Sequence, residues 1–89
     1  MLVLTREVGQ KVMFNGDIAA TVSVIGRDFC DVNISHRDGR PISNVTLRIG
    51  MSRQELAHGV WGHLVRLTAQ EKAHFAFEIP EGVTFAREA

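Results

Sequence analysis

The chain has 89 residues, which suits a single domain, since domains usually need roughly 50–200 residues to close a core. With 45% hydrophobic and 22% charged residues, the composition excludes a disordered tail. Ten basic and ten acidic residues cancel, which excludes a strongly cationic protein but leaves room for a local basic patch.

The first part of the chain alternates apolar and polar residues, which is typical of half-buried strands. The segments 2–6 and 12–14 are rich in residues that favour strands. Asn15-Gly16 then predicts a hairpin turn, because both residues tolerate positive φ. The next strand covers 18–24, and 26–28 is expected to form the following turn.

Alternation continues in the segments 30–35 and 45–49, with a break at 38–41. Near the end of the chain, 75–79 and 83–87 alternate again and are separated by a Pro-Glu-Gly turn. Each of these four segments is therefore predicted to be a strand.

The period changes between these strands, and a helix is expected at about 52–67. Ser52 and Glu55 have the spacing of a capping box, which satisfies free N–H groups at a helix start. Apolar residues follow at helical spacing: Leu56, Val60, Leu64 and Leu67, widened by Trp61 and Val65. Gly59 and Gly62 each disfavour a helix by about 1 kcal/mol relative to alanine. They indicate either close approach of another backbone or a weak, bent helix.

The predicted fold class is mainly β with one inserted α-helix, in one domain. No internal repeat of fixed period stands out in the sequence.

Few residues point to catalysis or to metal binding. His58 and His63 stand five apart, which places them on different faces of a helix, and no set of ligands has a recognised metal spacing. Neighbouring Ser35 and His36 are no evidence for a triad, because triads are assembled by the fold. Phosphate-binding glycine loops are absent from the sequence. We therefore expect no enzyme, no metal and no cofactor.

The single cysteine excludes an internal disulfide, and Cys30 is expected to be a small buried hydrophobe. No apolar run approaches the ~18 residues of a membrane helix, and residues 1–8 lack the apolar core of a signal peptide. The expected location is the cytoplasm, without membrane contact.

Both ends of the chain combine a strand with an arginine, Arg6 at one end and Arg87 at the other. Terminal strands are often sheet edges, whose free backbone groups can hydrogen-bond bases, while arginine binds phosphate or guanine. Two solvated arginines at strand ends would give the same pattern.

The two ends also resemble a known family. The opening 1–6 (MLVLTR) with Gly9 and the segment 16–22 (GDIAATV) is similar to the start of the carbon storage regulator (CsrA/RsmA) family, M-L-x-L-T-R-x-x-G-E with a later I-G-D-x-[IV]. The closing segment 75–88 (FAFEIPEGVTFARE) resembles the family's I-G-[IV]-x-A-P-x-x-V-x-V-x-R-E-E. These matches cover a little under half of the chain.

The chain departs from the family pattern in several places. Gln10 replaces a glutamate, Ile79 an alanine and Ala86 a histidine. The region of about 27–72, expected to hold two strands and the helix, has no counterpart in the short members and is treated as an insertion. A second register places Arg53 at the position of the key arginine, but it lacks the upstream proline.

The resemblance implies an interlaced, barrel-like homodimer that binds GGA-containing loops of mRNA or small regulatory RNA and so blocks translation or alters mRNA stability. In that family the first strand of one subunit lies beside the last strand of the other. Carried over to this chain, the RNA-binding residues would be Leu4, Thr5, Arg6, Ile79, Pro80, Val83, Arg87 and Glu88.

An alternative hypothesis is a protein-interaction module. In this reading the scaffold has lost its RNA contacts and binds a regulatory protein through the inserted helix, with Trp61 on its face. The neutral charge of the chain and the altered Ala86 favour this reading.

Overall fold

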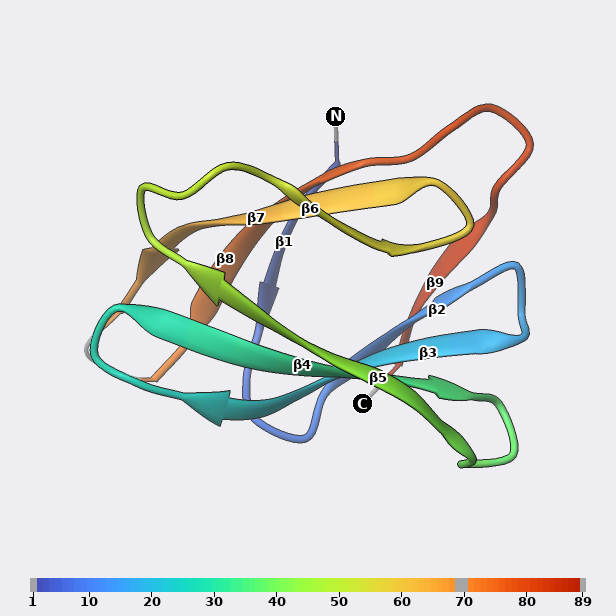
Figure 1. Cartoon of the computed structure of the whole chain (residues 1–89), viewed down its shortest axis with the longest axis horizontal. Coiled ribbons are helices and arrows are strands. Elements are labelled where there is room, and N and C mark those ends of the chain that lie inside the picture. The colour runs from blue at the N-terminus through green and yellow to red at the C-terminus, as the bar shows by residue number, and fades with distance from the viewer. Residues whose placement is uncertain (1, 69–70, 89) are drawn as a thin grey trace.

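The computed structural model describes residues 2–68 and 71–88, which form nine β-strands in two antiparallel sheets (Figure 1). The strands are β1 (Leu2–Arg6), β2 (Lys11–Phe14), β3 (Ile18–Ile25), β4 (Phe29–His36), β5 (Pro41–Arg48), β6 (Gln54–Ala57), β7 (Val60–Leu67), β8 (Ala73–Glu78) and β9 (Phe85–Glu88). The strands predicted from alternation are present. Pro41, expected to break the chain, instead begins β5, where a missing N–H group is tolerated at the first position of an edge strand.

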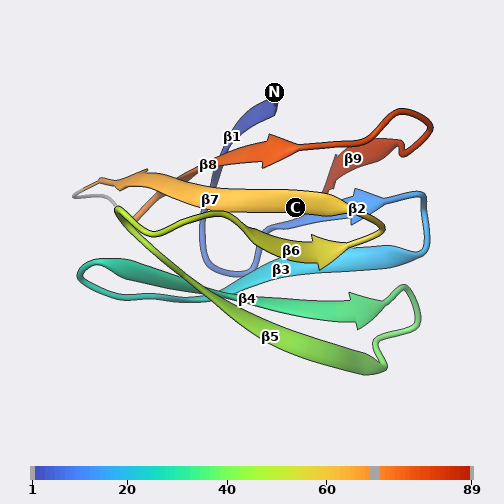
Figure 2. The ribbon, with the colours of Figure 1, turned by 45° about the horizontal axis from the view of Figure 1, so that its top comes forward.

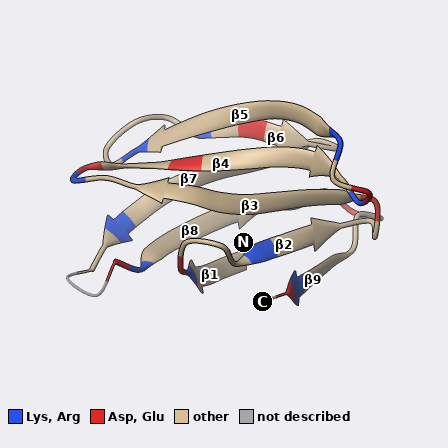
Figure 3. Ribbon diagram, turned by 90° about the horizontal axis from the view of Figure 1, so that it is seen from below, with Lys and Arg blue, Asp and Glu red and all other residues tan. Residues whose placement is uncertain are grey.

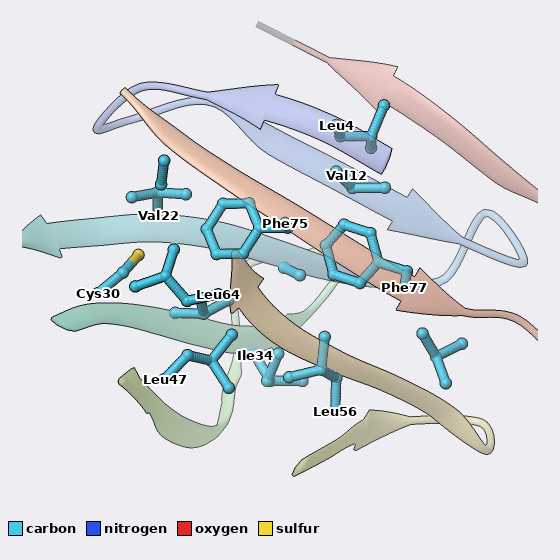
Figure 4. Close-up of a cluster of buried hydrophobic side chains, with 14 of the residues drawn as sticks. Leu4, Val12, Val22, Cys30, Ile34, Leu47, Leu56, Leu64, Phe75 and Phe77 are labelled. Carbon is cyan, nitrogen blue, oxygen red and sulfur yellow. The ribbon is translucent and has the colours of Figure 1, made fainter. Parts of the chain in front are cut away.

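The two sheets pack face to face (Figure 2). The four-stranded sheet has the order β1-β8-β7-β6, and the five-stranded sheet has the order β5-β4-β3-β2-β9. Their inner faces enclose one apolar core (Figure 4). Phe77 joins the sheets there, because its ring lies 6.1 Å from Phe14 and 5.7 Å from Phe75, centroid to centroid.

The hairpins β3–β4 and β7–β8 have the same construction. Val22 pairs with Val32, and Leu64 pairs with Phe75. A β-bulge follows each pair at the same point, after Val22 in β3 and after Leu64 in β7. Because the buried pairs and the bulges coincide, the two hairpins are structural equivalents about 42 residues apart.

The turns before these hairpins also correspond. In the β2–β3 turn, Asn15 and Gly16 have φ values of 54° and 70°. In the β6–β7 turn, His58 and Gly59 have φ values of 53° and 75°. Both turns therefore use two successive left-handed residues, the geometry that favours tight hairpins.

The first strand of each repeat pairs with the last strand of the other repeat. The chain consists of two four-strand repeats, β1–β4 and β5–β8, but β1 pairs with β8 and β5 pairs with β4. The registers of these two pairings agree. Leu4 lies opposite Phe75, and Val45 lies opposite Val32, which is the residue of the first repeat equivalent to Phe75. The resemblance implied that the first strand lies beside the last strand of another copy, but in this chain β1 pairs with β8 and the last strand, β9, pairs with β2. The structure also contains a repeat that the sequence did not reveal.

β9 stands outside this repeat and lies along β2, with Phe85 opposite Phe14. Among the described residues no strand takes the equivalent place beside β6, which is the edge of the four-stranded sheet. The two sides of the sandwich therefore differ.

The prediction of a helix at about 52–67 is wrong, because these residues form β6, the β6–β7 turn and β7. The described part of the chain holds no helix at all, so the fold is all-β and not mainly β with an inserted helix. Ser52 and Glu55 are both exposed and cap nothing. β5, β6 and β7, which form much of the second repeat, come from the region of about 27–72. The described residues include no helix able to cross a membrane.

Candidate nucleic-acid interface

β1 and β9 are edge strands of different sheets on the same side of the sandwich (Figure 3). Arg6 connects them. Its Nη1 donates hydrogen bonds to the carbonyl oxygens of Glu88, at 3.3 Å, and of Lys11, at 3.5 Å. Its Nε donates to the carbonyl oxygen of Thr5, at 2.8 Å. The guanidinium group of Arg6 thus holds the ends of the first and last strands together.

Arg87 and Phe85 lie on the face of β9 that looks toward the four-stranded sheet. Arg87 is opposite Val12 and Phe85 is opposite Phe14 in the β2–β9 ladder. Opposite residues of an antiparallel pair point to the same face, and Val12 and Phe14 point into the core. Because β9 lies at the margin, Arg87 stays exposed and Phe85 remains 43% exposed. An aromatic ring and a guanidinium group on β9 are therefore open to solvent.

Thr5 and Leu4 have different roles, although both were predicted to bind. Thr5 is exposed on the outer face of β1, and its hydroxyl lies 2.9 Å from Nδ1 of His74. Leu4 is only 3% exposed and packs in the core opposite Phe75. Leu4 thus stabilises the sandwich and offers no side chain to a ligand.

The remaining predicted residues lie in the β8–β9 connection, toward the other end of β9. Ile79 and Val83 pack against the core, and the N–H group of Val83 donates to the carbonyl of Pro80, at 3.2 Å. The connection is tied to the β2–β3 turn, since Asn15 and Thr84 exchange two hydrogen bonds of 2.9 and 3.0 Å. The structure therefore brings Arg6 and Glu88 into contact, with Thr5 and Arg87 as their neighbours in β1 and β9, and places Ile79, Pro80 and Val83 apart from them.

Charged residues of both signs gather where β1, β2 and β9 meet (Figure 3). The basic ones are Arg6, Lys11 and Arg87, and Glu7 and Glu88 accompany them. Among the described residues, neither Arg6 nor Arg87 forms an ion pair with a carboxylate. Both guanidinium groups thus keep donors for a ligand.

Sequence reasoning missed Phe85, Lys11 and His74 in this region. The alternation of the closing segment placed Phe85 and Arg87 on one face, so the sequence held a signal for Phe85. The pairing of β2 with β9, which brings Lys11 opposite Glu88, links segments more than 70 residues apart and left no local signal.

Arg53, the alternative key arginine, lies between β5 and β6, away from β9. Its guanidinium group forms an ion pair with Glu78 and lies 5.0 Å from the centre of the Trp61 ring. These contacts occupy Arg53 on the outer face of the four-stranded sheet. Of the two alignments with the family, the one that places Arg87 at the key position therefore has a guanidinium group without an ion pair among the described residues.

The structure also places the other reactive groups. No cluster of three or more His, Cys, Asp or Glu in residues 2–68 and 71–88 has the arrangement of a metal site. Cys30 is fully buried, and burial together with the negative charge of Asp31 raises the pKa of its thiol to about 12. Cys30 therefore remains a neutral core residue at physiological pH.

A comparison of the chain with protein-family models, with curated proteins and with solved structures found no match. The resemblance to the CsrA/RsmA family thus rests on the residues of the two chain ends, and the β1–β9 edge is the candidate site those residues form.

Proposed function

We propose that the chain is a post-transcriptional regulator that binds a GGA-containing, single-stranded RNA loop at the β1–β9 edge. The observation that carries the proposal is the contact between Arg6 and the Glu88 carbonyl, which holds two open strand edges together beside the exposed Arg87. Its targets are mRNA or small regulatory RNA in the cytoplasm. It needs no cofactor and no catalytic step.

The chemistry of the edge suits unpaired bases. Edge strands carry N–H and C=O groups with no strand partner, and these can bond the base edges that a single strand exposes. Phe85 supplies a ring for base stacking, and Arg87 supplies a planar fork for guanine O6 and N7. The local mixture of charges fits selective binding of a short loop better than tight binding of any polyanion.

One chain is sufficient for the proposed site, because its first and last strands come from the same molecule. Translation is repressed when the bound loop overlaps a ribosome-binding site. Pairing of two chains into a homodimer would then add sites and is not required to form one.

The decisive experiment is a fluorescence titration of the purified chain with a GGA hairpin and with a hairpin of scrambled loop. Selective binding of the GGA loop at physiological salt is the expected result. Equal affinity for both hairpins would remove the sequence-selective function, and absence of binding to either would remove the RNA-binding function altogether.

A further inference from the structure

A line of polar side chains crosses the outer face of the five-stranded sheet, starting from the proposed RNA edge. In the ladders, Glu88 lies opposite Lys11, Lys11 opposite Thr21, Thr21 opposite Asn33, and Asn33 opposite Asn44. Opposite residues share a face. This row is on the outer face because the neighbouring row, which includes Val12 and Ala20, points into the core.

The row ends in a groove of about 440 Å³ over β3, β4 and β5. Hydroxyl and amide side chains line part of it, from Thr21, Asn33, Ser35, Ser43 and Asn44, and Ile34, Pro41 and Ile42 supply apolar surface. No Asp, Glu, Lys or Arg is among the described residues that line it. The volume lies within the roughly 300–1,000 Å³ that ligand sites occupy. A neutral groove with amide donors and acceptors beside apolar surface suits an uncharged group that has polar edges and apolar faces.

Charged groups flank the groove on both sides. Lys11 lies three strands from Asn44, a distance of about 14 Å at ordinary strand spacing. At the other end, the β4–β5 hairpin carries Arg37 and Arg40. Asp38 accepts a hydrogen bond from Arg40, so this end is only partly neutralised. Cations on either side of a neutral groove match a chain of phosphates that carries uncharged bases.

We infer that the groove binds an unpaired nucleotide of the RNA that flanks the loop held at the β1–β9 edge, with Asn33 and Asn44 bonding its base. The amide side chain of asparagine pairs with N6 and N7 of adenine, which makes adenine the favoured base. This inference rests on the proposed function and extends its footprint from the sheet edge onto the sheet face. Asn33 and Asn44 are exposed strand residues, so their replacement leaves the core untouched.

The test compares a GGA hairpin without flanks with the same hairpin carrying a single-stranded adenine flank of about six nucleotides, on either side in turn. One flank is expected to raise the affinity of the wild-type chain about tenfold, the value of one good amide–base pair. Asn33→Ala and Asn44→Ala should abolish this gain and leave the affinity for the unflanked hairpin unchanged. Ser52→Ala, an exposed polar residue between β5 and β6, is the matched control and should keep the gain.

The outcomes separate the inference from the proposed function. If the hairpin binds but neither flank adds affinity, or if the gain survives in both Asn33→Ala and Asn44→Ala, the groove is not a nucleotide site. If the hairpin does not bind, the function at the edge fails, and the groove is tested alone by adding oligoadenylate to isotope-labelled chain. Shifts of the Asn33 and Asn44 side-chain amide signals would support it, and unchanged signals would overturn it.

Discussion

Gly62 and Phe77 face each other across β7 and β8, at the position that Ala20 and Ile34 occupy in the first repeat. A methyl group built on Gly62 would lie 3.0 Å from the Phe77 ring. In the second repeat the small Gly62 thus faces the large Phe77. Together they fill the part of the core that corresponds to the Ala20–Ile34 pair of the first repeat.

This relationship predicts an energetic coupling between the two positions. Gly62→Ala should lower the free energy of unfolding by about 1–3 kcal/mol, because the added methyl group overpacks the ring. Phe77→Ile should cost a similar amount by leaving space. The double variant recreates the Ala20–Ile34 pair and should be more stable than the sum of the two changes predicts. Urea unfolding of all four proteins measures the coupling, and strict additivity would contradict the equivalence of the repeats.

The missed helix shows how a strand pair can imitate helical spacing. Leu56, Val60 and Leu64 are all buried, but a turn with left-handed His58 and Gly59 separates the first from the other two. Within β7 the buried positions alternate, and one of them is glycine, so the period of two does not appear in a scan for apolar residues. Phe77 explains why that glycine is needed, and the explanation depends on a strand distant in the chain.

The sequence pointed to the two arginines of the candidate site, but it did not predict how the strands that carry them pair. The sequence indicates that Arg6 and Arg87 end terminal strands, and both predictions of a strand agree with the structure. Burial of Leu4 follows from the opposite sheet, which no local pattern describes. The exchange of β1 and β5 likewise depends on long-range pairing, and the two repeats differ too much in residue type for the duplication to be visible.

The buried thiol of Cys30 predicts a loss of stability at alkaline pH. Its pKa is raised from 9.0 in the unfolded chain to about 12 in the folded protein. As the pH rises, the unfolded state therefore loses the thiol proton before the folded state does. The contribution of the neutral thiol to the free energy of unfolding is complete below pH 9 and is lost as the pH rises toward 12. The loss amounts to about 1.4 kcal/mol for each pH unit in that window.

Cys30→Ala serves as the reference in this measurement, because every other titrating group is shared. The difference in unfolding free energy between wild type and variant should shrink as the pH rises from 9. In parallel, the native thiol should react slowly with a disulfide reagent and quickly in denaturant. A pH-independent difference would indicate that the thiolate forms in the folded protein without penalty.

Removing the free guanidinium group of β9 tests the RNA edge directly. Arg87→Ala should weaken binding to the GGA hairpin about 5- to 150-fold, since a good arginine–guanine contact is worth about 1–3 kcal/mol. Arg53→Ala removes the same charge from the outer face of the four-stranded sheet, away from β9, and should change the affinity about twofold at most. Equal losses in both variants would indicate that general charge attraction, and not a contact at β9, holds the RNA.

The exposed ring of Phe85 gives a prediction that separates base stacking from charge. Base–aromatic stacking is worth about 1–3 kcal/mol per base, so Phe85→Ala should reduce RNA affinity about 5- to 150-fold. Phe85→Trp keeps a stacking surface and should retain most of the affinity, whereas Phe85→Leu keeps apolar area without an aromatic face and should not. Thermal melts check that each variant is folded, as expected for a side chain that is 43% exposed at the sheet margin. If leucine and tryptophan bound RNA equally well, Phe85 would act through its apolar area alone, and the proposed stacking on the β1–β9 edge would be wrong.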